Sequence, residues 1–379
     1  MNNYEFLLQI IKNEFLCQNA PFISCNDTEL SDIYALAKAH DLSHILLPYF
    51  KSGGLNTGNE DLAKKIKSSY NMAVFRDVKR EYVKNETFDI FNNAGIKFVP
   101  LKGAVISQLY PQSWMRTSCD IDILVKEDEI EKALDVLSAN GFETNRERSY
   151  HDVSLYKDGT HIELHYNICE NLPRIDPVLV KVWENCSQFD KCEYRESPEF
   201  LVFHHIAHMC YHFVFGGCGI KPFIDLYLLK TKVDYSESGL KKLLEQSDLV
   251  KFYDKVCELM NVWFADAEHN SVTLKMEAYI LDGGVFGNID NNSIMMSAMR
   301  DSKTKNFFAI VFPSYETMCN TYPVLRQHKL LLVFYYIKRI IQKLTKSGDR
   351  VVGRMANLAS QDAETVNTAS EFLSELGLK

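Results

Sequence analysis

The chain has 379 residues, of which 46% are hydrophobic and 24% are charged. This composition is ordinary for a globular protein and excludes a fibrous or disordered chain, and the length allows two or three domains. The formal net charge of −8 argues against a non-specific nucleic-acid binder, so we expect the partner to be a small molecule or a protein.

Ten cysteines are scattered along the chain without a Cys-x-x-Cys pair or a regular spacing. The pattern is typical of free thiols, and the first residues show no basic segment leading into a long apolar one. We therefore expect a cytoplasmic protein. The longest apolar run, LLLVFYYI at 330–337, is too short to cross a bilayer, so the sequence predicts no transmembrane segment.

Residues 1–75 have the pattern of an N-terminal helical region. The stretch DTELSDIYALAKA offers a capped helix start at Asp27 or Thr28, followed by apolar residues at helical spacing. A loop rich in Gly, Asn and Ser is predicted at 51–59. A further helix is then predicted over about 60–93, ending at Gly95. Its apolar face is formed by Val83, Ile90, Phe91 and Ala94.

After Gly95, short apolar runs alternate with one clear helix. The runs IKFVPL, CDIDILV, DVSLYK and HIELHYNI predict strands, whereas 127–140 predicts a helix that stops at Gly141. The apolar stripe of that helix is Ile130, Ala133, Leu134 and Leu137. We expect a small α/β domain over 76–190 and a helical domain over 191–379, where helical periodicity returns from Pro198 onward.

Two carboxylates interrupt the strand predicted at RTSCDIDILV. Because strand side chains alternate between faces, Asp120 and Asp122 project together while Ile121 and Ile123 project to the other side. Two like charges held side by side need compensation, and hard divalent cations prefer carboxylate oxygens. The pattern therefore indicates a metal site, with the solvated face of an edge strand as the alternative.

A third carboxylate lies in the middle of the strand predicted at HIELHYNI. There, His161, Glu163 and His165 share one face. If this strand pairs with the DIDIL strand, Glu163 joins the two aspartates in a cluster of the kind that holds two Mg²⁺ ions for phosphoryl transfer.

Upstream, Lys102 and Gly103 stand where the strand IKFVP gives way to LKGAVISQLY, a predicted helix start. Free backbone N–H groups at a helix start suit an anion, glycine allows a phosphate to approach the backbone, and lysine adds positive charge. The strand–Lys-Gly–helix arrangement is by itself more often structural. Here, however, Arg116 and the two aspartates follow it in order, which makes the combination specific.

Together, LKGAVISQLYPQSWMRTSCDIDILV and HIELHYNI resemble the uncharacterised nucleotidyltransferase-like proteins of the DNA polymerase β nucleotidyltransferase superfamily. The resemblance covers about residues 95–170 and, more loosely, the helical part to about 230. It implies an α+β fold, in which a small mixed-sheet nucleotidyltransferase domain is flanked by N-terminal and C-terminal helical regions. The wider superfamily has Gly-Ser at the phosphate-binding turn, whereas this chain has Lys102-Gly103, as the narrower family does.

The resemblance also implies roles for individual residues. Asp120 and Asp122 would bridge two Mg²⁺ ions, with Mn²⁺ as the substitute, and Glu163 would join the ion beside the attacking hydroxyl. The residues expected to contact the nucleotide are Lys102, Gly103 and Arg116, with Lys221 and Asp225 in a second tier. The implied reaction is attack of an acceptor hydroxyl on the α-phosphorus of a nucleoside triphosphate, with release of pyrophosphate and with Glu163 or a neighbouring aspartate as general base.

Several weaker signals keep alternatives open. The stretch FHHIAHMCYHF places His204, His208 and His212 on one helix, where two adjacent rings could bind zinc, although a cleft-lining role for His208 is the stronger expectation. His165 is expected either to contact the acidic cluster or to lie on the surface. Asp225 has a simpler alternative role, which is to complement a helix N-terminus.

The leading hypothesis is a Mg²⁺-dependent nucleotidyltransferase whose acceptor is a small molecule or a protein rather than a nucleic acid. One alternative is a glycosyltransferase with a metal-binding Asp-x-Asp, which predicts a larger doubly wound domain. Another is a nucleotide-binding module whose site has decayed. Under the leading hypothesis, changing Asp120 or Asp122 to Asn abolishes turnover, and neither change lowers the thermal stability in metal-free buffer.

Overall fold

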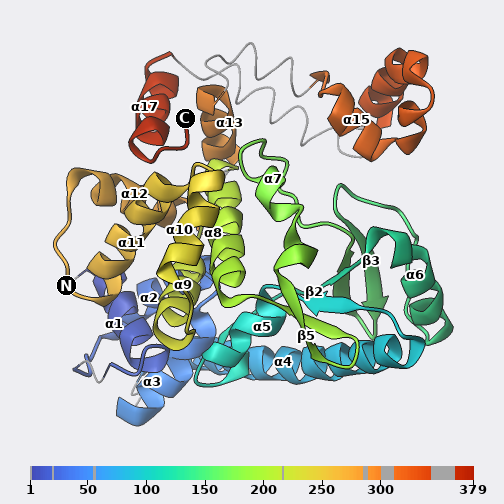
Figure 1. Ribbon diagram of the computed structural model, residues 1–379. Coiled ribbons are helices and arrows are strands. Elements are labelled where there is room, and N and C mark those ends of the chain that lie inside the picture. The colour runs from blue at the N-terminus through green and yellow to red at the C-terminus, as the bar shows by residue number, and fades with distance from the viewer. Residues whose placement is uncertain are drawn as a thin grey trace.

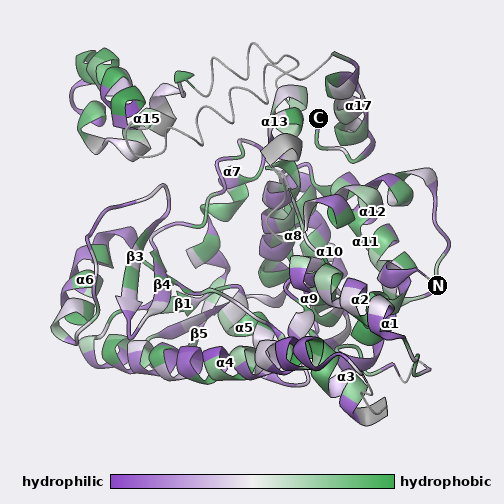
Figure 2. Ribbon diagram, turned by 180° about the vertical axis from the view of Figure 1, so that it is seen from behind, coloured by the Kyte–Doolittle hydropathy of each residue, from purple (hydrophilic) through white to green (hydrophobic). Residues whose placement is uncertain are grey.

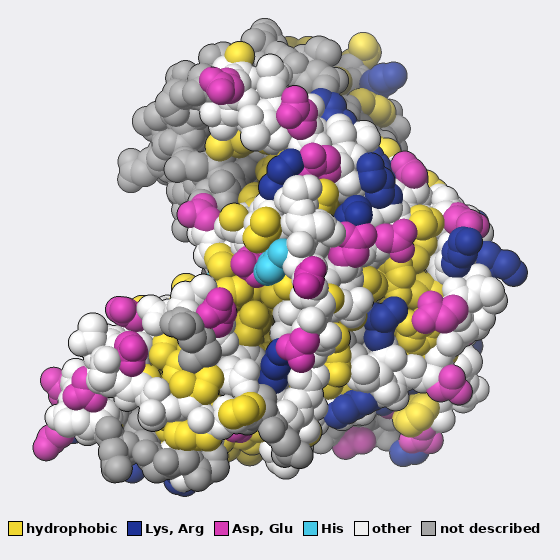
Figure 3. Space-filling view, turned by 90° about the vertical axis from the view of Figure 1, so that its left-hand side faces the viewer, with side chains coloured by type: hydrophobic (Ala, Val, Ile, Leu, Met, Phe, Trp, Pro, Cys, Tyr) yellow, Lys and Arg dark blue, Asp and Glu magenta, His cyan; other side chains and the backbone are white. Residues whose placement is uncertain are grey.

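The computed structural model describes residues 2–18, 21–53, 57–215, 217–284, 289–299, 311–342 and 363–379. The fold is α+β, because one six-stranded mixed sheet is embedded in a mostly helical chain (Figure 1). Acidic and basic side chains are mixed, with apolar ones between them, over the face shown in Figure 3. Within the described residues, no helix is both long enough and apolar enough to cross a membrane.

The N-terminal helices are α1 (Asn3–Glu14), α2 (Asp27–Ala39) and α3 (Leu46–Gly53). Helix α2 begins at Asp27, within the predicted start, but its cap is Asn26, one residue earlier than predicted. The Asn26 side chain accepts hydrogen bonds from the backbone N–H groups of Thr28 and Glu29, and the Glu29 carboxylate accepts one from the Asn26 N–H. The predicted loop at 51–59 is helical as far as Gly53, and its residues 54–56 lie outside the described residues.

The long helix α4 (Glu60–Ala94) runs along the sheet, as Figure 1 shows at the bottom of the molecule. It ends as predicted at Gly95, which has a φ of 66°, a left-handed conformation that glycine adopts without a steric penalty. Because α4 is continuous through residues 75 and 76, the same helix contacts the N-terminal helices at one end and the sheet at the other. The division into three domains stays a prediction.

The sheet contains β1 (Phe98–Pro100), β2 (Asp120–Val125), β3 (Asp152–Lys157), β4 (Thr160–His165), β5 (Cys186–Asp190) and β6 (Glu193–Glu196). Its strand order is β3-β4-β2-β1-β6-β5. Strand β2 is parallel to β4 and antiparallel to β1. The two strands that carry the predicted carboxylates are therefore neighbours in the middle of the sheet.

The two faces of the sheet differ in chemistry. One face packs against α4 and α6 (Ile130–Ala139), which flank it at the lower left of Figure 2. The buried residues between these layers include Ile121, Ile123, Ile162 and Leu164, together with the predicted α6 stripe of Ile130, Ala133, Leu134 and Leu137. Because strand side chains alternate, this apolar packing forces the carboxylates onto the opposite face.

The C-terminal helices cover much of the sheet face that carries the carboxylates. Three short helical segments come before them in the chain: α5 (Gly103–Ile106) after β1, the 3₁₀ turn η3 (Ser113–Met115) before β2, and α7 (Asp176–Leu179) after β4. The C-terminal helices are α8 (Pro198–Val214), α9 (Lys221–Lys232), α10 (Glu237–Gln246), α11 (Val250–Phe264), α12 (Ser271–Gly283), α13 (Ile289–Met299), α15 (Tyr315–Thr321) and α17 (Ala363–Glu375). Helix α8 is buried along most of its length, so it serves as a central core helix.

Candidate active site

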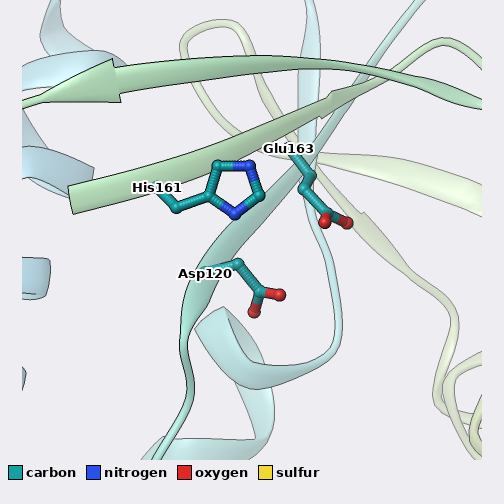
Figure 4. A group of neighbouring side chains, drawn as sticks. All are labelled: Asp120, His161 and Glu163. Carbon is teal, nitrogen blue, oxygen red and sulfur yellow. The ribbon is translucent and has the colours of Figure 1, made fainter. Parts of the chain in front are cut away.

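The parallel pairing of β2 and β4 brings the predicted carboxylates together. Asp120 lies opposite His161, and Asp122 lies opposite Glu163. Figure 4 shows Asp120 projecting from one strand toward His161 and Glu163 on its neighbour. Ligand atoms of these three residues lie within 4.8 Å of one another, and the same holds for Asp122, Glu163 and His165. The predicted strand pairing is confirmed, while the catalytic and metal-binding roles stay predictions.

The two aspartates differ in their surroundings. Asp122 is buried, with its Oδ1 at 2.9 Å from His165 Nε2 and 3.5 Å from Lys102 Nζ. Burial raises the pKa of Asp122, but Lys102 and His165 outweigh it, so its pKa lies well below the usual value. Asp120 is half-buried and accepts a hydrogen bond from Ser118 Oγ at 2.8 Å. Burial, followed by the charge of Asp122, raises the pKa of Asp120.

His165 connects the carboxylates from the end of β4. Its Nε2 lies 2.9 Å from Asp122 and 3.6 Å from Glu163 Oε2, and its ring stacks on His151 at a centroid distance of 5.1 Å. Burial lowers the pKa of His165, but the hydrogen bonds to Asp122 and Glu163 outweigh it and raise the pKa. Of the two alternatives for His165, contact with the acidic cluster is the one observed.

The Lys102-Gly103 turn lies beside the cluster. Lys102 has a φ of 41°, a left-handed conformation that costs a residue with a side chain free energy, and its ammonium is directed at Asp122. A Cβ on Gly103 would lie 2.6 Å from Arg116 Nη1. Glycine is therefore favoured here because a guanidinium packs against the turn, a reason different from the phosphate approach expected from the sequence.

Arg116 is paired with Asp225 of α9. The guanidinium donates from Nε to Oδ1 at 2.9 Å and from Nη2 to Oδ2 at 2.8 Å, and Tyr110 donates to Oδ1 at 2.6 Å. Burial raises the pKa of Asp225, but Arg116 outweighs it, so the carboxyl has a lowered pKa. This buried pair connects the segment before β2 to the C-terminal helices.

Lys221 is also engaged by protein groups. Its ammonium donates to the Thr117 carbonyl at 2.9 Å and to Asp41 Oδ2 at 3.1 Å. Asp41 in turn accepts a hydrogen bond from Thr117 Oγ1 at 2.5 Å. The predicted second tier, Lys221 and Asp225, is thus adjacent to the cluster and consists of ion-paired residues.

A cavity of about 390 Å³ lies between the acidic face of the sheet and helices α8 and α9. Almost all of the predicted site residues line it; His165 is not among them and lies directly behind Asp122. The lining residues relevant here are Lys102, Gly103, Arg116, Asp120, Asp122, Glu163, Glu170, His208, Lys221 and Asp225. The size suits a small-molecule ligand.

Glu170 is a cavity residue that the sequence analysis missed. It is buried in the segment between β4 and α7, where its Oε1 lies 2.6 Å from His208 Nδ1. His208 Nε2 lies 3.0 Å from His212 Nε2, which extends the hydrogen-bonded chain along α8. Burial and the charge of Lys102 hold the pKa of His208 well below its usual value, so the ring is neutral and donates to Glu170. No strand or helix periodicity marks Glu170, because it lies in an irregular segment.

The other histidines of α8 have separate partners. His204 Nδ1 lies 2.8 Å from Glu196 Oε1, and His205 Nε2 lies 2.9 Å from the Pro222 carbonyl. Within the part of the chain that the structure describes, the only two groups able to offer three metal ligands are the two at the sheet. The cleft-lining expectation for His208 therefore agrees with its position.

A family model described as "Uncharacterised nucleotidyltransferase" matches residues 26–265, more than half of the chain. The chain belongs to this nucleotidyltransferase family. The matched span of the nucleotidyltransferase runs from α2 through the sheet to the end of α11, so it contains the acidic cluster and the Lys102-Gly103 turn. Neither a curated protein nor a solved structure matches the chain.

Proposed function

We propose that this protein is a Mg²⁺-dependent transferase of the polymerase β type that moves a nucleoside monophosphate from a triphosphate to an acceptor hydroxyl. The observation that carries the proposal is the parallel register of β2 and β4, which brings Asp120, Asp122 and Glu163 together at a cavity beside Lys102. Family membership supports transferase chemistry. The small mixed sheet gives no support to the glycosyltransferase alternative, which requires a larger doubly wound domain.

The donor set fits divalent cations. Carboxylate oxygens are the ligands that Mg²⁺ and Mn²⁺ prefer, and Asp120, Asp122 and Glu163 would hold the two ions. Lys102 and His165 balance the charge of Asp122, whereas Asp120 has a raised pKa and, among the described residues, only a Ser118 hydroxyl as a hydrogen-bond partner. Bound cations would acidify the acceptor hydroxyl and neutralise charge that develops on the triphosphate.

The protein groups then have distinct tasks. Lys102, whose ammonium lies 3.5 Å from Asp122, would face the phosphates, and Arg116 would support the turn through its packing against Gly103. His165 keeps Asp122 ionised and fixed in orientation. Asp120 and Glu163 are the more exposed carboxylates of the cluster, so an acceptor hydroxyl can reach them and transfer its proton there.

We also propose a cytoplasmic location, which the ten free thiols support. A decayed site is disfavoured because all three carboxylates and Lys102 converge on one cavity.

Thermal unfolding with Mg²⁺ and each of ATP, GTP, CTP and UTP tests the function. A ligand at 100 times its dissociation constant stabilises the folded state by about 2.7 kcal/mol, so binding gives a measurable rise in Tm. We expect a rise that requires the metal and is lost in Asp122→Asn. The matched control is Asp128→Asn, which removes one charge from an exposed residue outside the cavity. A rise with UDP-glucose alone, or no rise with any triphosphate, would contradict the proposal.

A further inference from the structure

A second cavity, of about 480 Å³, lies between α2 and α4. We call it the basic groove. Its walls are formed by residues of α2, of the turn after α2, of α4, and of the segment that leads into β2. Its lining comprises Tyr34, Lys38, Asp41, Ser43, His44, Lys65, Ser68, Ser69, Met72, Ala73, Arg76, Asp77, Arg80, Trp114, Thr117, Ser118 and Cys119.

The acids of the basic groove are already neutralised by protein groups. Asp77 accepts hydrogen bonds from Arg80 and from Ser113, each at 2.6 Å. Asp41 is paired with Lys221, which reaches it from α9. Neither carboxylate is therefore available to balance further positive charge in the groove.

Three cations of the basic groove remain unbalanced. Lys38, Lys65 and Arg76 are exposed, and none of them makes an ion pair with any of the residues that the structure describes. They lie on two facing helices around one cavity, in a chain whose net charge is −8. Because a concave wall concentrates the field of such charges, the groove attracts anions, and phosphate in particular.

The basic groove borders the acidic cluster. Thr117, Ser118 and Cys119 line both cavities, and Ser118 Oγ donates to Asp120 at 2.8 Å. Arg80 also reaches this segment, since its Nη1 lies 3.4 Å from the Ser118 carbonyl. The groove thus approaches the cluster from the Asp120 side, whereas Lys102 and Arg116 line only the other cavity.

We propose that the basic groove binds the acceptor, and that the acceptor is a small phosphorylated hydroxyl compound such as a sugar phosphate or polyol phosphate. This inference rests on the proposed transferase function. The cations would bind the phosphate, and the hydroxyls of Tyr34, Ser43, Ser68 and Ser69 would bind the polyol. The volume is that of a small-molecule site.

The proposed transfer exchanges one bond at the α-phosphorus for another. The acceptor oxygen forms a bond to the α-phosphorus, the bond between the α-phosphorus and the bridging oxygen breaks, and pyrophosphate leaves with that electron pair. The acceptor proton passes to Asp120 or Glu163. The phosphate already on the acceptor stays unchanged and serves only to hold the molecule in the groove.

Phosphate binding in the presence of nucleotide tests the inference. The cavity beside Lys102 is first filled with Mg²⁺ and an α,β-methylene triphosphate, and inorganic phosphate is then titrated by calorimetry. We expect Lys65→Glu/Arg76→Glu to weaken phosphate binding at least about tenfold, since each substitution replaces a positive charge that would attract the phosphate with a negative charge that repels it. The matched control Lys132→Glu/Lys242→Glu makes the same charge change at exposed residues outside the groove and should bind phosphate as the wild type does. Equal weakening in both variants, or in neither, overturns the inference.

The same proteins separate the two proposals. If the wild type does not bind the Mg²⁺–triphosphate analogue, the transferase proposal fails. If all variants bind the analogue and only the groove variant loses phosphate, both proposals stand. If all variants bind the analogue but the charge changes in the groove do not alter the affinity for phosphate, only the acceptor inference fails. Circular dichroism and the Tm of each variant verify folding.

The acceptor class is then read from transfer of α-³²P-labelled nucleotide. We expect labelling of glucose 1-phosphate or glycerol phosphate to exceed that of glucose or glycerol, and the excess to disappear in Lys65→Glu/Arg76→Glu. Preferential labelling of a short RNA, or equal labelling of phosphorylated and unphosphorylated compounds, would overturn the proposed class.

Discussion

At the scale of single residues, the two aspartates of β2 project from one strand face yet are stabilised differently. Asp122 is buried against Lys102 and His165, and its ionised form is favoured. Asp120 lines the cavity and, within the described part of the chain, has a single hydroxyl donor, and its ionised form is disfavoured. The charge of Asp122 is therefore balanced by groups of the folded protein, whereas the charge of Asp120 is opposed by its surroundings.

This difference predicts opposite effects of the same substitution. In metal-free buffer, we expect Asp120→Asn to keep or raise the Tm, because it removes repulsion from Asp122. Asp122→Asn should lower stability by about 1–3 kcal/mol, because Lys102 and His165 lose a charged acceptor. The expectation from sequence that neither change lowers stability therefore needs revision for Asp122. Urea unfolding checks both, with Asp128→Asn as control, and a loss with Asp120→Asn would contradict the account.

A histidine outside the site predicts an acid sensitivity. His40 follows α2 and is fully buried, and neither ring nitrogen has a hydrogen-bond partner among the described residues. Burial lowers the pKa of His40 to about 4 from 6.5. Because the unfolded chain binds a proton that the folded one does not, stability falls as the pH drops from 6.5 toward 4.

Through His40, acidification from pH 7 to pH 5 should lower the free energy of unfolding by roughly 2 kcal/mol. We expect His40→Leu to lose less stability on this acidification than the wild type, as measured by urea unfolding at the two pH values. His328→Leu, at an exposed position, should keep the wild-type dependence. An unchanged pH dependence in His40→Leu would show that other groups cause the acid sensitivity.

At the scale of elements, the conformation of the turn between β1 and α5 depends on the Arg116 side chain that packs against it. Lys102 adopts a left-handed conformation, and Gly103 admits the Arg116 guanidinium, so the turn directs an ammonium at the acidic face of the sheet. The turn and the strands thereby form one site, although they come from separate parts of the chain.

Gly103→Ala tests this construction. A methyl group 2.6 Å from Arg116 Nη1 forces the turn or the guanidinium to move, so we expect a stability loss of about 1–3 kcal/mol. The affinity for Mg²⁺–triphosphate should fall as well, since Lys102 moves with the turn. Gly58→Ala is the control, because its new Cβ would make only an ordinary contact with Asp27 at 3.4 Å. An unchanged affinity of Gly103→Ala for Mg²⁺–triphosphate would show that the turn does not contribute to nucleotide binding.

At the scale of the whole molecule, the site forms where three layers meet. The sheet supplies the carboxylates, α8 and α9 cover one cavity, and α2 with α4 forms the basic groove. The Arg116–Asp225 pair is a direct link between the segment before β2 and α9, and the side chains of Arg116 and Asp225 are 11% and 2% exposed. The geometry of the cavity therefore depends on that pair.

We expect Asp225→Leu to lower the free energy of unfolding by about 3–5 kcal/mol, because Arg116 stays buried without a partner. The double variant Arg116→Met/Asp225→Leu should recover much of this loss, since an apolar pair removes both desolvation penalties. Urea unfolding of the two single variants and the double variant measures the coupling. Additive effects of the two substitutions would contradict a direct pair.

By itself, the sequence determined the features that depend on local periodicity. The alternation in DIDILV and HIELHYNI fixes which residues share a face, and the stripe of α6 and the stop of α4 at Gly95 follow from helical spacing and glycine conformation. The order of these motifs also indicated the family that the comparison confirmed.

Tertiary structure decided which surfaces oppose one another. The sequence shows that Glu163 shares a face with His165, but only the register of β2 and β4 places it opposite Asp122. Glu170 lies in an irregular segment, and Arg116 meets Asp225 across more than a hundred residues, so no periodicity could reveal either. The physical reason is that side-chain alternation is a property of one strand, whereas a site depends on packing between elements that are distant in the chain.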